Sequence, residues 1–534
     1  MTKSRLISLS IIGGILFSLA WTEFIPGLII FIAFVPLLIV EEHLYSDRKY
    51  NTPVLMFLYA YFQFAILNLC TSWWLYKVSM FGPMSTVLMN SFFMAIPFWL
   101  FHITKRKLGP NLGYLSFIIY WMAFEHLHTN WDFSNPYLSL GNGIIKEISL
   151  IQWYEFTGVA GGSLWIILIN LFIFKIFVSF RKNKSVKKES KKLLALLLLI
   201  IIPLLESIII FNTYKEKDDP KEIVIVQPNI DPYFEKFDIM TIDQQLQKML
   251  DLAADKADIS TDYIVGPETS LPNYVFERHI KNDFQTIKLK NFLTNYPQTN
   301  FVLGINTRKL YTQGEKISST AHKTEDNQYF DLYNTAMQID KEGHIQLYHK
   351  SQLIMGTEKI PYSNLLKFLE KFSINLGGMG GSYGKQKERS VFYDKEQTTG
   401  IGPVICWESV YGEYITDYVK NGANYIFVIT NDGWWGNTPG YKIHLRFSQL
   451  RAIENRRSIA RSANTGISCF INQKGEIIKS TEWWTATAIK ANINANAKMT
   501  FYTIHGDYIS RICDLIAGIL ILLTFIRPII KNNN

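Results

Sequence analysis

Eight long runs of apolar residues constrain the fold of this chain more than any other feature of its sequence. An α-helix needs about 20 mainly apolar residues to cross the hydrocarbon core of a bilayer. Seven runs that approach or reach this length precede residue 212, and one lies near the C-terminus. The predicted spans are residues 6–21, 24–40, 54–75, 85–101, 112–127, 163–180, 193–211 and 512–526. We therefore expect a bundle of eight transmembrane helices. The first run follows Lys3 and Arg5, as a signal peptide would, but it has no convincing cleavage site, which predicts a retained span.

Basic residues between the predicted spans indicate the orientation of the bundle. The segments on one side are rich in them, and the alternate segments contain few. The basic residues on the first side are Lys3, Arg5, Arg48, Lys49, those of 105–107 and of 181–192, Arg527 and Lys531. Because cytoplasmic loops carry an excess of Lys and Arg, both termini are predicted to be cytoplasmic. The odd number of spans before residue 221 then places the following domain on the opposite face, which is the periplasm of a bacterial cell.

The composition is consistent with two kinds of region. The chain of 534 residues is 48% hydrophobic, and its formal charge is +9. Much of the basic excess lies between the apolar runs, as expected of membrane topology. We find no nucleic-acid-binding motif and predict no nucleic-acid partner. The expected organisation is a bundle at 1–213, a soluble domain at 221–499 and a final helix at 510–530.

Residues 221–499 alternate between short β-rich runs and helical stretches, which favours a layered α/β fold. The predicted strands are 222–226, 263–266, 301–306, 333–339, 402–405, 425–430 and 468–472. The predicted helices are 243–257, 280–294 and 444–461. Residues 340–343 and 472–475 have the composition of hairpin turns. GxxxxGK, GxGxxG, HExxH and CxxC patterns are absent from the sequence, so we predict neither a cofactor nor a metal site.

Cys406 is the best candidate nucleophile among the four cysteines. Cys70 and Cys513 lie in predicted spans, and Cys469 lies in an apolar run, where a free cysteine is usually a buried packing residue. Cys406 ends the apolar strand Gly-Pro-Val-Ile-Cys and precedes a helical stretch. A nucleophile at a strand-to-helix turn is exposed at the sheet edge, close to backbone N–H groups that can stabilise an oxyanion. A lone cysteine is more often structural than catalytic, so the residues near Cys406 must show which role it has.

Two further segments place charged residues at predicted strand ends. Glu268 ends the run Asp-Tyr-Ile-Val-Gly-Pro-Glu, and Lys350 ends Leu-Tyr-His-Lys. Taken singly, each is expected to be a solvated surface charge. Together with Cys406 they give the order Glu, Lys, Cys, which resembles the arrangement of carbon–nitrogen hydrolases of the nitrilase type.

The resemblance extends over nearly the whole chain and is closest to the apolipoprotein N-acyltransferase family of the bacterial envelope. The matching segments are Pro-Tyr-Leu-Ser-Leu-Gly at 136–141, Val-Gln-Pro-Asn at 226–229, Gly-Pro-Glu-Thr at 266–269, Tyr-His-Lys at 348–350, Gly-Thr-Glu-Lys-Ile-Pro at 356–361, Cys-Trp-Glu at 406–408, Asn-Asp-Gly-Trp-Trp-Gly at 431–436, Arg-Ser-Ala-Asn-Thr-Gly at 461–466 and Thr-Phe-Tyr at 500–502. The chain departs from the family at Met355-Gly-Thr-Glu358, where Pro-Phe-Gly-Glu is more usual, and at Trp407, where tyrosine is. Neither departure removes a catalytic group.

This resemblance implies a nitrilase-like α-β-β-α sandwich inserted between spans, and an acyl transfer in two steps. Cys406 would attack a phospholipid ester with Glu268 as general base, while Lys350 and the backbone N–H of Trp407 hold the oxyanion. The thioester would then acylate the α-amine of a diacylglyceryl apolipoprotein. Glu358 and Glu408 are expected to support the triad, and Trp434 and Trp435 to form an aromatic lid or contact lipid. The implied protein is a multi-pass monomer of the bacterial inner membrane.

Alternative interpretations stay open at this point. Glu358 and Glu408 could equally be ion-pair or surface carboxylates, and the two tryptophans could be packing residues. The glycine-rich segment 376–384 is predicted to be a flexible loop. A membrane-anchored amidase that uses water as acceptor would have the same triad, although anchoring requires one helix only. A transporter or receptor would have paired polar residues in mid-span, which the sequence does not indicate.

Overall fold

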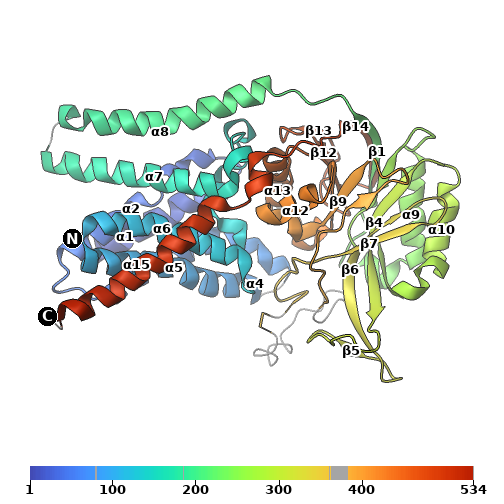
Figure 1. Ribbon diagram of the computed structural model, residues 1–534, viewed down its shortest axis with the longest axis horizontal. Coiled ribbons are helices and arrows are strands. Elements are labelled where there is room, and N and C mark those ends of the chain that lie inside the picture. Colours follow the sequence, from blue (N-terminus) through green and yellow to red (C-terminus); the bar gives the residue numbers. More distant parts are fainter. Residues whose placement is uncertain (79–80, 184–185, 360, 363–382, 533–534) are drawn as a thin grey trace. The chain divides into compact units, whose positions relative to one another are not determined.

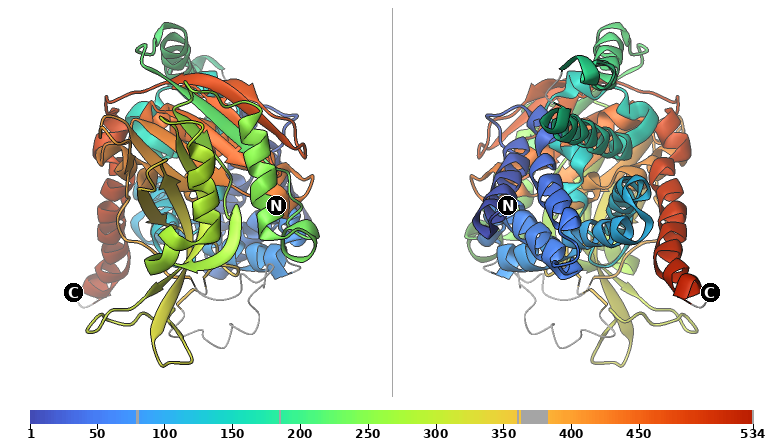
Figure 2. Two further views of the ribbon diagram at one scale, coloured as in Figure 1. Left: turned by 90° about the vertical axis from the view of Figure 1, so that its right-hand side faces the viewer. Right: turned by 90° about the vertical axis from the view of Figure 1, so that its left-hand side faces the viewer.

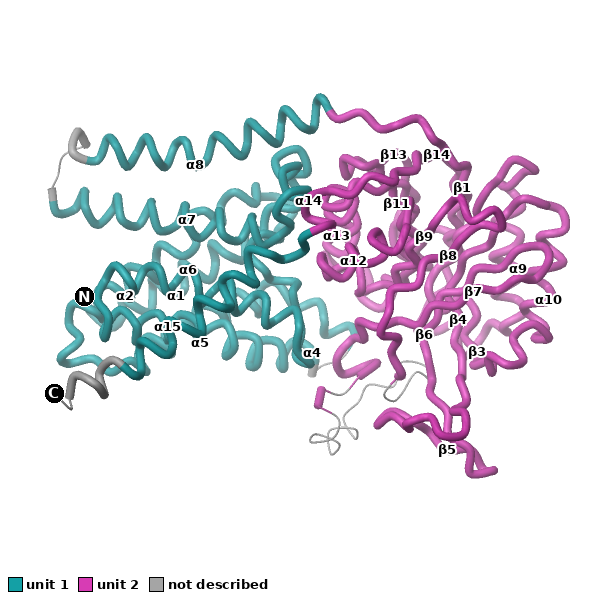
Figure 3. Tube along the Cα trace, viewed as in Figure 1, with its two compact units in different colours: residues 1–213, 505–534 teal, residues 214–504 magenta. Residues whose placement is uncertain are grey.

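A computed structural model describes residues 1–534 except 79–80, 184–185, 360, 363–382 and 533–534 (Figure 1). The chain forms two compact units (Figure 3). One comprises residues 1–213 and 505–534, and the other comprises residues 214–504. The predicted glycine-rich loop at 376–384 lies outside the described residues except for its last two.

Helices are the regular elements in the described residues of the first unit. Its long helices are α1 (Lys3–Ala20), α2 (Val35–Ser46), α3 (Pro53–Ser72), α5 (Ser91–Leu108), α6 (Pro110–Asn130), α7 (Tyr154–Asn183), α8 (Val186–Thr213) and α15 (Tyr508–Asn532). Short helical pieces connect them, namely η1 (Gly27–Ile32), η2 (Trp73–Lys77), α4 (Phe81–Ser85), η3 (Thr86–Asn90), η4 (Pro136–Leu138), η5 (Leu140–Ile144) and η6 (Ile148–Leu150). Each predicted span therefore coincides with helical structure.

The composition and exposure of these helices identify a membrane protein. Among the described residues, seven helices are long and apolar enough to cross a bilayer. The predicted span at 112–127 lies in α6, which is not among the seven. The clearest case is α8, whose span Glu189–Thr213 has a mean hydropathy of 3.0 although only 6% of it is buried within the protein. So large an exposed apolar surface is stable in lipid and not in water.

Several ionisable side chains of this unit are paired near the ends of predicted spans. The Glu41 carboxylate lies 2.5 Å from Lys105 Nζ and 2.8 Å from His102 Nδ1. Asp514 similarly pairs with His126. Glu125 Oε1 accepts hydrogen bonds from the Trp121 indole and from the backbone N–H of Leu140, each at 2.8 Å. Glu125 thus fastens the connecting loop to α6, which is a structural role.

The second unit contains two sheets. The first has eight strands, with the order β14-β1-β2-β4-β6-β5, and β3 and β7 pair with β4 and β6. Its strands are β1 (Pro220–Gln227), β2 (Tyr263–Val265), β3 (Leu271–Phe276), β4 (Asn300–Leu310), β5 (His322–Lys323), β6 (Tyr329–Ile339), β7 (Ile345–His349) and β14 (Thr487–Asn494). The second has six strands in the order β13-β12-β11-β10-β9-β8. They are β8 (Phe392–Tyr393), β9 (Gly400–Ile405), β10 (Tyr425–Thr430), β11 (Ser458–Ala463), β12 (Cys469–Ile471) and β13 (Ile477–Ser480).

The two sheets pack face to face, and helices cover their outer faces. The Tyr263 ring of β2 meets the Phe427 ring of β10 at 5.4 Å, which joins the two sheets. α9 (Ile242–Ala254) and α10 (Phe284–Leu293) lie across the first sheet (left view of Figure 2). α12 (Gly412–Lys420) and α13 (Pro439–Asn455) flank the second sheet (Figure 1). The short helices η7 (Glu235–Ile239), η8 (Glu277–Asn282), η10 (Cys406–Val410), η11 (Asp432–Trp435) and α14 (Phe501–His505) complete the described helical elements. This arrangement confirms the predicted α-β-β-α sandwich.

Two predicted helices have other bounds. The helix expected at 444–461 ends at Asn455, because Arg456 adopts a left-handed φ of 48° and the next residues form β11. Arg457 and Arg461 are charged residues, which are uncommon in a buried strand, yet both are buried here. Their presence therefore led us to predict a helix where the chain forms a strand. The helix expected at 280–294 is interrupted at Asp283, whose side chain accepts the backbone N–H of Gln285 and so caps α10.

Strand direction decides where the candidate residues gather. β2 and β4 are parallel, and β6 is antiparallel to β4. Because β7 is antiparallel to β6, it points the same way as β2. The segments that follow β2 and β7 therefore leave the sheet at the same edge, and these segments begin with Gly266 and Lys350.

Candidate active site

Glu268 and Lys350 meet in a buried ion pair at this edge. Lys350 Nζ donates to Glu268 Oε1 at 3.0 Å, and the side chains are 1% and 8% exposed. The chain reaches this geometry because Gly304 of β4 lies directly against the backbone of Glu268. A Cβ at position 304 would lie 2.6 Å from Glu268 Cα, so a glycine is required there.

Two more side chains complete the polar cluster. Glu358 Oε1 accepts from Lys350 Nζ at 2.9 Å, and its Oε2 accepts the backbone N–H of Ile354 at 2.8 Å. Asn334 of β6 donates to Glu268 at 2.8 Å and to Glu358 at 3.1 Å. One ammonium and one amide therefore hold both carboxylates in fixed positions.

Cys406 is the first residue of η10, directly after β9, and has a strained backbone conformation. Its φ is 50°, a left-handed conformation that is uncommon for a residue with a side chain, and its side chain is buried. Such strain persists only where the surroundings impose it, and it is enriched at functional sites. The charge of the buried Glu268 carboxylate acts on this thiol, so the two side chains belong to one electrostatic cluster.

The charges of these groups follow from their surroundings. Burial alone raises the pKa of Glu268, but the Lys350 ammonium and the hydrogen bonds from Asn334 and Lys350 hold that pKa below its ordinary value. Burial lowers and the two carboxylates raise the pKa of Lys350, with a net rise well above its ordinary value. Burial and the Glu268 charge raise the pKa of Cys406 well above that of a free cysteine. The resting cluster therefore contains a thiol, a carboxylate and an ammonium.

Glu408 joins the backbone segments that carry Lys350 and Cys406. Its Oε1 accepts the N–H of Ser351 at 2.7 Å, and its Oε2 accepts the N–H of Ile405 at 2.9 Å. The hydroxyls of Tyr348 and Tyr414 donate to Oε1 at 2.8 and 2.5 Å. Glu408 is fully buried, so its predicted alternative as a surface carboxylate is wrong.

His444 supports the Cys406 turn from α13. His444 Nε2 lies 3.1 Å from the Cys406 carbonyl oxygen, and Nδ1 lies 3.0 Å from Asp432 Oδ1. Arg461 donates to the other oxygen of Asp432 at 2.7 Å. Although burial opposes it, Arg461 and His444 hold the pKa of Asp432 below its ordinary value. Asp432 and Arg461 lie in two of the segments that resemble the family, but no local pattern connects them with His444 of α13.

The three tryptophans near the turn have different surroundings. The Trp407 ring is parallel to the His444 ring at 6.1 Å and is 6.4 Å from the Trp435 ring. Trp435 is buried, whereas Trp434 is partly exposed and meets the Tyr233 ring at 5.2 Å. The lid role assigned to Trp434 and Trp435 stays a prediction.

Lys236 is a second buried lysine close to Glu268. Its Nζ donates to Thr269 Oγ1 at 2.6 Å, and the residue is 4% exposed. Burial lowers the pKa of Lys236 to about 8, although the Glu268 charge opposes this shift. The sequence did not single out Lys236, because η7 is neither amphipathic nor adjacent to a predicted strand end.

Comparison with known proteins identifies the fold family of this unit. Residues 223–499 match the carbon-nitrogen hydrolase family over more than half of the chain. The chain belongs to the carbon-nitrogen hydrolase family. Residues 13–172 match the N-terminal domain of apolipoprotein N-acyltransferases.

Curated relatives extend the similarity to both units. An apolipoprotein N-acyltransferase of Chlorobaculum tepidum is 28% identical over 98% of this chain and 98% of its own length. One of Geobacter metallireducens is 24% identical over 98% of this chain and 96% of its own length. The predicted resemblance is therefore confirmed. Among solved structures, Saccharomyces cerevisiae Nit3, of the nitrilase superfamily, covers 55% of this chain and 95% of its own at 12% identity and a TM-score of 0.36.

The carbon-nitrogen hydrolase domain brings together most of the residues predicted for the site. Glu268, Lys350, Cys406 and Glu358 form one cluster, and Glu408 and Trp407 are attached to its backbone. The described part of this domain contains one group of side chains of the kinds that bind metals, with ligand atoms within 4.8 Å of one another. These are Asp340, Glu342 and His344. They lie in the β6–β7 turn, at the other end of β7 from Lys350.

Proposed function

We propose that this protein transfers an acyl chain from a membrane phospholipid to the α-amino group of the N-terminal diacylglyceryl-cysteine of apolipoproteins. The observation that carries the proposal is the buried Glu268–Lys350 ion pair beside the buried Cys406 thiol, in a chain whose relatives are named apolipoprotein N-acyltransferases. An anchored hydrolase would need one helix, whereas this chain has several helices apolar enough for a membrane.

The first half-reaction begins with proton transfer within the cluster. Glu268, held ionised by Lys350, takes the proton of the Cys406 thiol as sulfur attacks the ester carbonyl. Lys350 and the backbone N–H of Trp407 stabilise the oxyanion of the tetrahedral intermediate. As the carbon–oxygen bond breaks, the leaving lysophospholipid takes the proton from Glu268, and a thioester remains on Cys406.

The second half-reaction uses the same groups. The neutral α-amine of the apolipoprotein attacks the thioester carbonyl, and Glu268 accepts the proton that the nitrogen loses. Collapse of the intermediate forms the amide and expels the thiolate, which recovers its proton from Glu268. Neither half-reaction needs a redox partner or a cofactor. Hydrogen bonds from Asn334 to Glu268 and from Lys350 to Glu358 keep Glu268 and Lys350 in place during both.

We also propose the cellular arrangement that this chemistry requires. Both termini are cytoplasmic, and the carbon-nitrogen hydrolase domain faces the periplasm of a bacterium from its inner membrane. The protein acts as a monomer. The supporting observation is the alternation of basic and non-basic segments between the spans.

Mass spectrometry of a lipoprotein N-terminus tests the function directly. The protein, phospholipid and a diacylglyceryl apolipoprotein are incubated in detergent, and the N-terminal peptide should gain the mass of one acyl chain. Enzyme with phospholipid alone should accumulate an acyl adduct on Cys406 that hydroxylamine releases. If water discharges this adduct as fast as the apolipoprotein does, the protein is an amidase or esterase and the proposal is wrong.

A further inference from the structure

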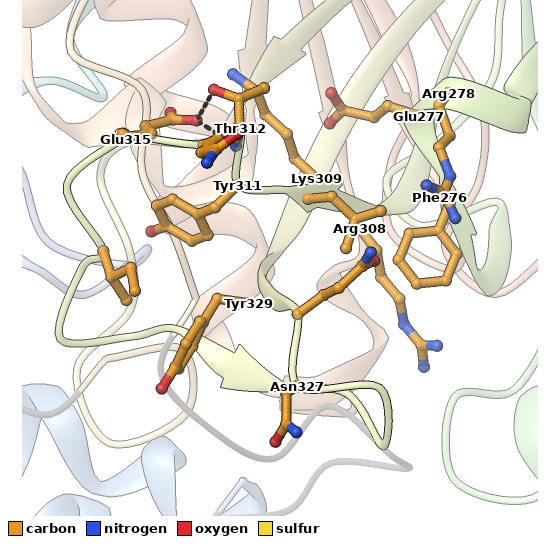
Figure 4. A pocket seen from close by; sticks show the side chains of 15 residues that line it. Phe276, Glu277, Arg278, Arg308, Lys309, Tyr311, Thr312, Glu315, Asn327 and Tyr329 are labelled. Carbon is orange, nitrogen blue, oxygen red and sulfur yellow. Dashed lines mark hydrogen bonds between the residues drawn. The ribbon is translucent and has the colours of Figure 1, made fainter.

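The residues that line a cavity of about 800 Å³ at the ends of β3 and β4 include none of the Glu268 cluster (Figure 4). Arg308 and Lys309 line it, but as consecutive residues of β4 they lie on opposite faces of the sheet and do not converge on one ligand. Glu315 in its wall accepts hydrogen bonds from the backbone N–H and the hydroxyl of Thr312, at 3.0 and 3.1 Å (Figure 4). This cavity therefore adds no group to the proposed reaction.

A much smaller cavity lies beside the general base. It measures about 10 Å³, which is about the room that one water molecule needs, and it is lined by Glu268, Thr269, Lys236 and Gln245 among others. An acyl chain or a lipid headgroup cannot enter so small a space. The groups around it therefore influence the reaction through Glu268 and not by contact with a substrate.

Lys236 extends its ammonium group to this side from η7. Its Nζ donates to the hydroxyl of Thr269 at 2.6 Å, and Thr269 directly follows Glu268. Its backbone carbonyl accepts Gln245 Nε2 at 2.6 Å, which fixes Lys236 to α9. Lys236 also lines an open pocket of about 550 Å³ together with residues 237–242. Thr269 lines the small cavity and not the open pocket, so the ammonium group lies on the side of Glu268.

The burial of this ammonium group is unfavourable. Within the described part of the chain, no carboxylate oxygen lies within 4.0 Å of Lys236 Nζ, although the residue is 4% exposed. The lowered pKa of Lys236 reflects this cost of burial. An apolar side chain would fill the same place without it. The physical reason for a lysine is therefore to be sought in its hydrogen bond to Thr269.

That hydrogen bond holds a strained turn next to the general base. Thr269 has a left-handed φ of 48°, which is unfavourable for a β-branched residue. The Pro267 carbonyl of the same turn accepts the Ser270 hydroxyl at 2.6 Å and the backbone N–H of Gly304 at 3.0 Å. β4 thus holds the turn through Gly304, and η7 holds it through Lys236.

We propose that Lys236 is a positioning residue for the general base, because its hydrogen bond to Thr269 fixes the peptide that carries Glu268. This inference rests on the proposed function and adds a residue that the two half-reactions do not use. A general base acts only within hydrogen-bond reach of the proton that it removes. A small displacement of the Glu268 peptide should therefore slow the chemical step without weakening donor binding.

Single-turnover acylation tests this role. Purified full-length protein in neutral detergent is mixed with dipalmitoyl phosphatidylethanolamine, and intact mass follows the acyl-enzyme. The measured quantities are the maximal rate constant, the half-saturating donor concentration and the final acylated fraction. Lys236→Met, which keeps the length of the side chain and removes its ammonium group, should lower only the rate constant, by about tenfold, as expected for loss of a charge-assisted hydrogen bond.

Substitutions of Thr269 test the other partner of the hydrogen bond. Thr269→Val removes the hydroxyl at nearly constant volume and should also lower the rate constant about tenfold. Thr269→Ser keeps the hydroxyl and should retain the rate. The double variant Lys236→Met/Thr269→Val should be no slower than Lys236→Met, because both changes remove the same hydrogen bond. If Lys236→Met does not fold, equal rate constants for Thr269→Val and Thr269→Ser would refute the inference.

Lys256→Met is the matched control, because Lys256 is an exposed lysine of the same domain that pairs with Asp255 and lines neither the small cavity nor the open pocket. Its three quantities should equal those of the unmodified protein. A Lys236→Met rate constant equal to that of Lys256→Met would overturn the positioning role, and so would losses that add in the double variant.

Two other results would assign Lys236 a different role and also overturn the inference. A lower acylated fraction at an unchanged rate constant would show that Lys236 only stabilises the fold. A higher half-saturating concentration at an unchanged rate constant would show that it binds the donor. Failure of the proposed function looks different, because the unmodified protein would then form no Cys406 adduct.

Discussion

At the scale of single residues, the Cys406 thiol owes its character to a few identified neighbours. Burial and the Glu268 carboxylate raise its pKa, and Lys350 opposes them. Cys469 is also buried, and burial raises its pKa to about 12, but it lies in β12 away from the Glu268 cluster. A thiol with a raised pKa reacts only when a base removes its proton in the same step.

We expect Cys406→Ala to abolish acyl transfer and the hydroxylamine-sensitive adduct. Cys469→Ala should largely retain both, because Cys469 has only a packing role. Rates of transfer and the mass of the acyl-enzyme measure the two effects. Equal loss of transfer in both variants would show that Cys406 is not the nucleophile.

Glu268→Gln should separate acid–base catalysis from thiol acidity. Loss of the base should slow acyl-enzyme formation by about 10²–10⁴-fold. Loss of the negative charge should at the same time lower the pKa of Cys406, since Glu268 raises it. The midpoint of iodoacetamide alkylation should therefore move to lower pH, which mass spectrometry across a pH series measures. A midpoint that stays unchanged or rises would refute the electrostatic account.

At the scale of elements, the ends of strands carry the site. The predicted strand at 425–430 coincides with β10, and those preceding Glu268 and Cys406 were found within one or two residues. These strands are buried and therefore continuously apolar, which makes them recognisable. β14 was missed because its sequence, Thr-Ala-Ile-Lys-Ala-Asn-Ile-Asn, has polar residues on a partly exposed edge strand. Asn334 was missed because it lies within a strand, where no local pattern marks a functional side chain.

The support of the Cys406 turn by α13 leads to a further prediction. His444→Gln should lower the maximal rate of acyl-enzyme formation about tenfold with little change in the half-saturating donor concentration. The reason is that His444 contacts the Cys406 carbonyl and so positions the nucleophile. Lys442→Gln, an exposed change on the same helix, is the control. A rise in half-saturating concentration without a rate change would contradict this positioning role.

At the scale of the whole molecule, apolar patterning predicted a helical region and an α/β region. The seven apolar helices and the separate α/β unit agree with the sequence interpretation. The span at 112–127 is helical, but α6 contains Asn, His and Glu residues and is less apolar than its neighbours. The orientation in the membrane follows from charge alone and stays a prediction.

Reporter fusions test that orientation. A reporter fused after Lys187 should be cytoplasmic, and one fused after Asp218 should be periplasmic, because α8 lies between the two positions. Alkaline phosphatase and green fluorescent protein give opposite signals on the two sides. Both fusions on one side would contradict the topology and the proposed location of the carbon-nitrogen hydrolase domain.

The bridging role of Glu408 has a consequence for motion. Its carboxylate binds the main chain just after Lys350 and just before Cys406, so these segments cannot drift independently. The separation of the ammonium and the thiol is thereby set during folding, and the loss of conformational entropy has already occurred when the lipid arrives. The acyl donor meets a site that is already assembled, and its binding energy remains available for the chemical step.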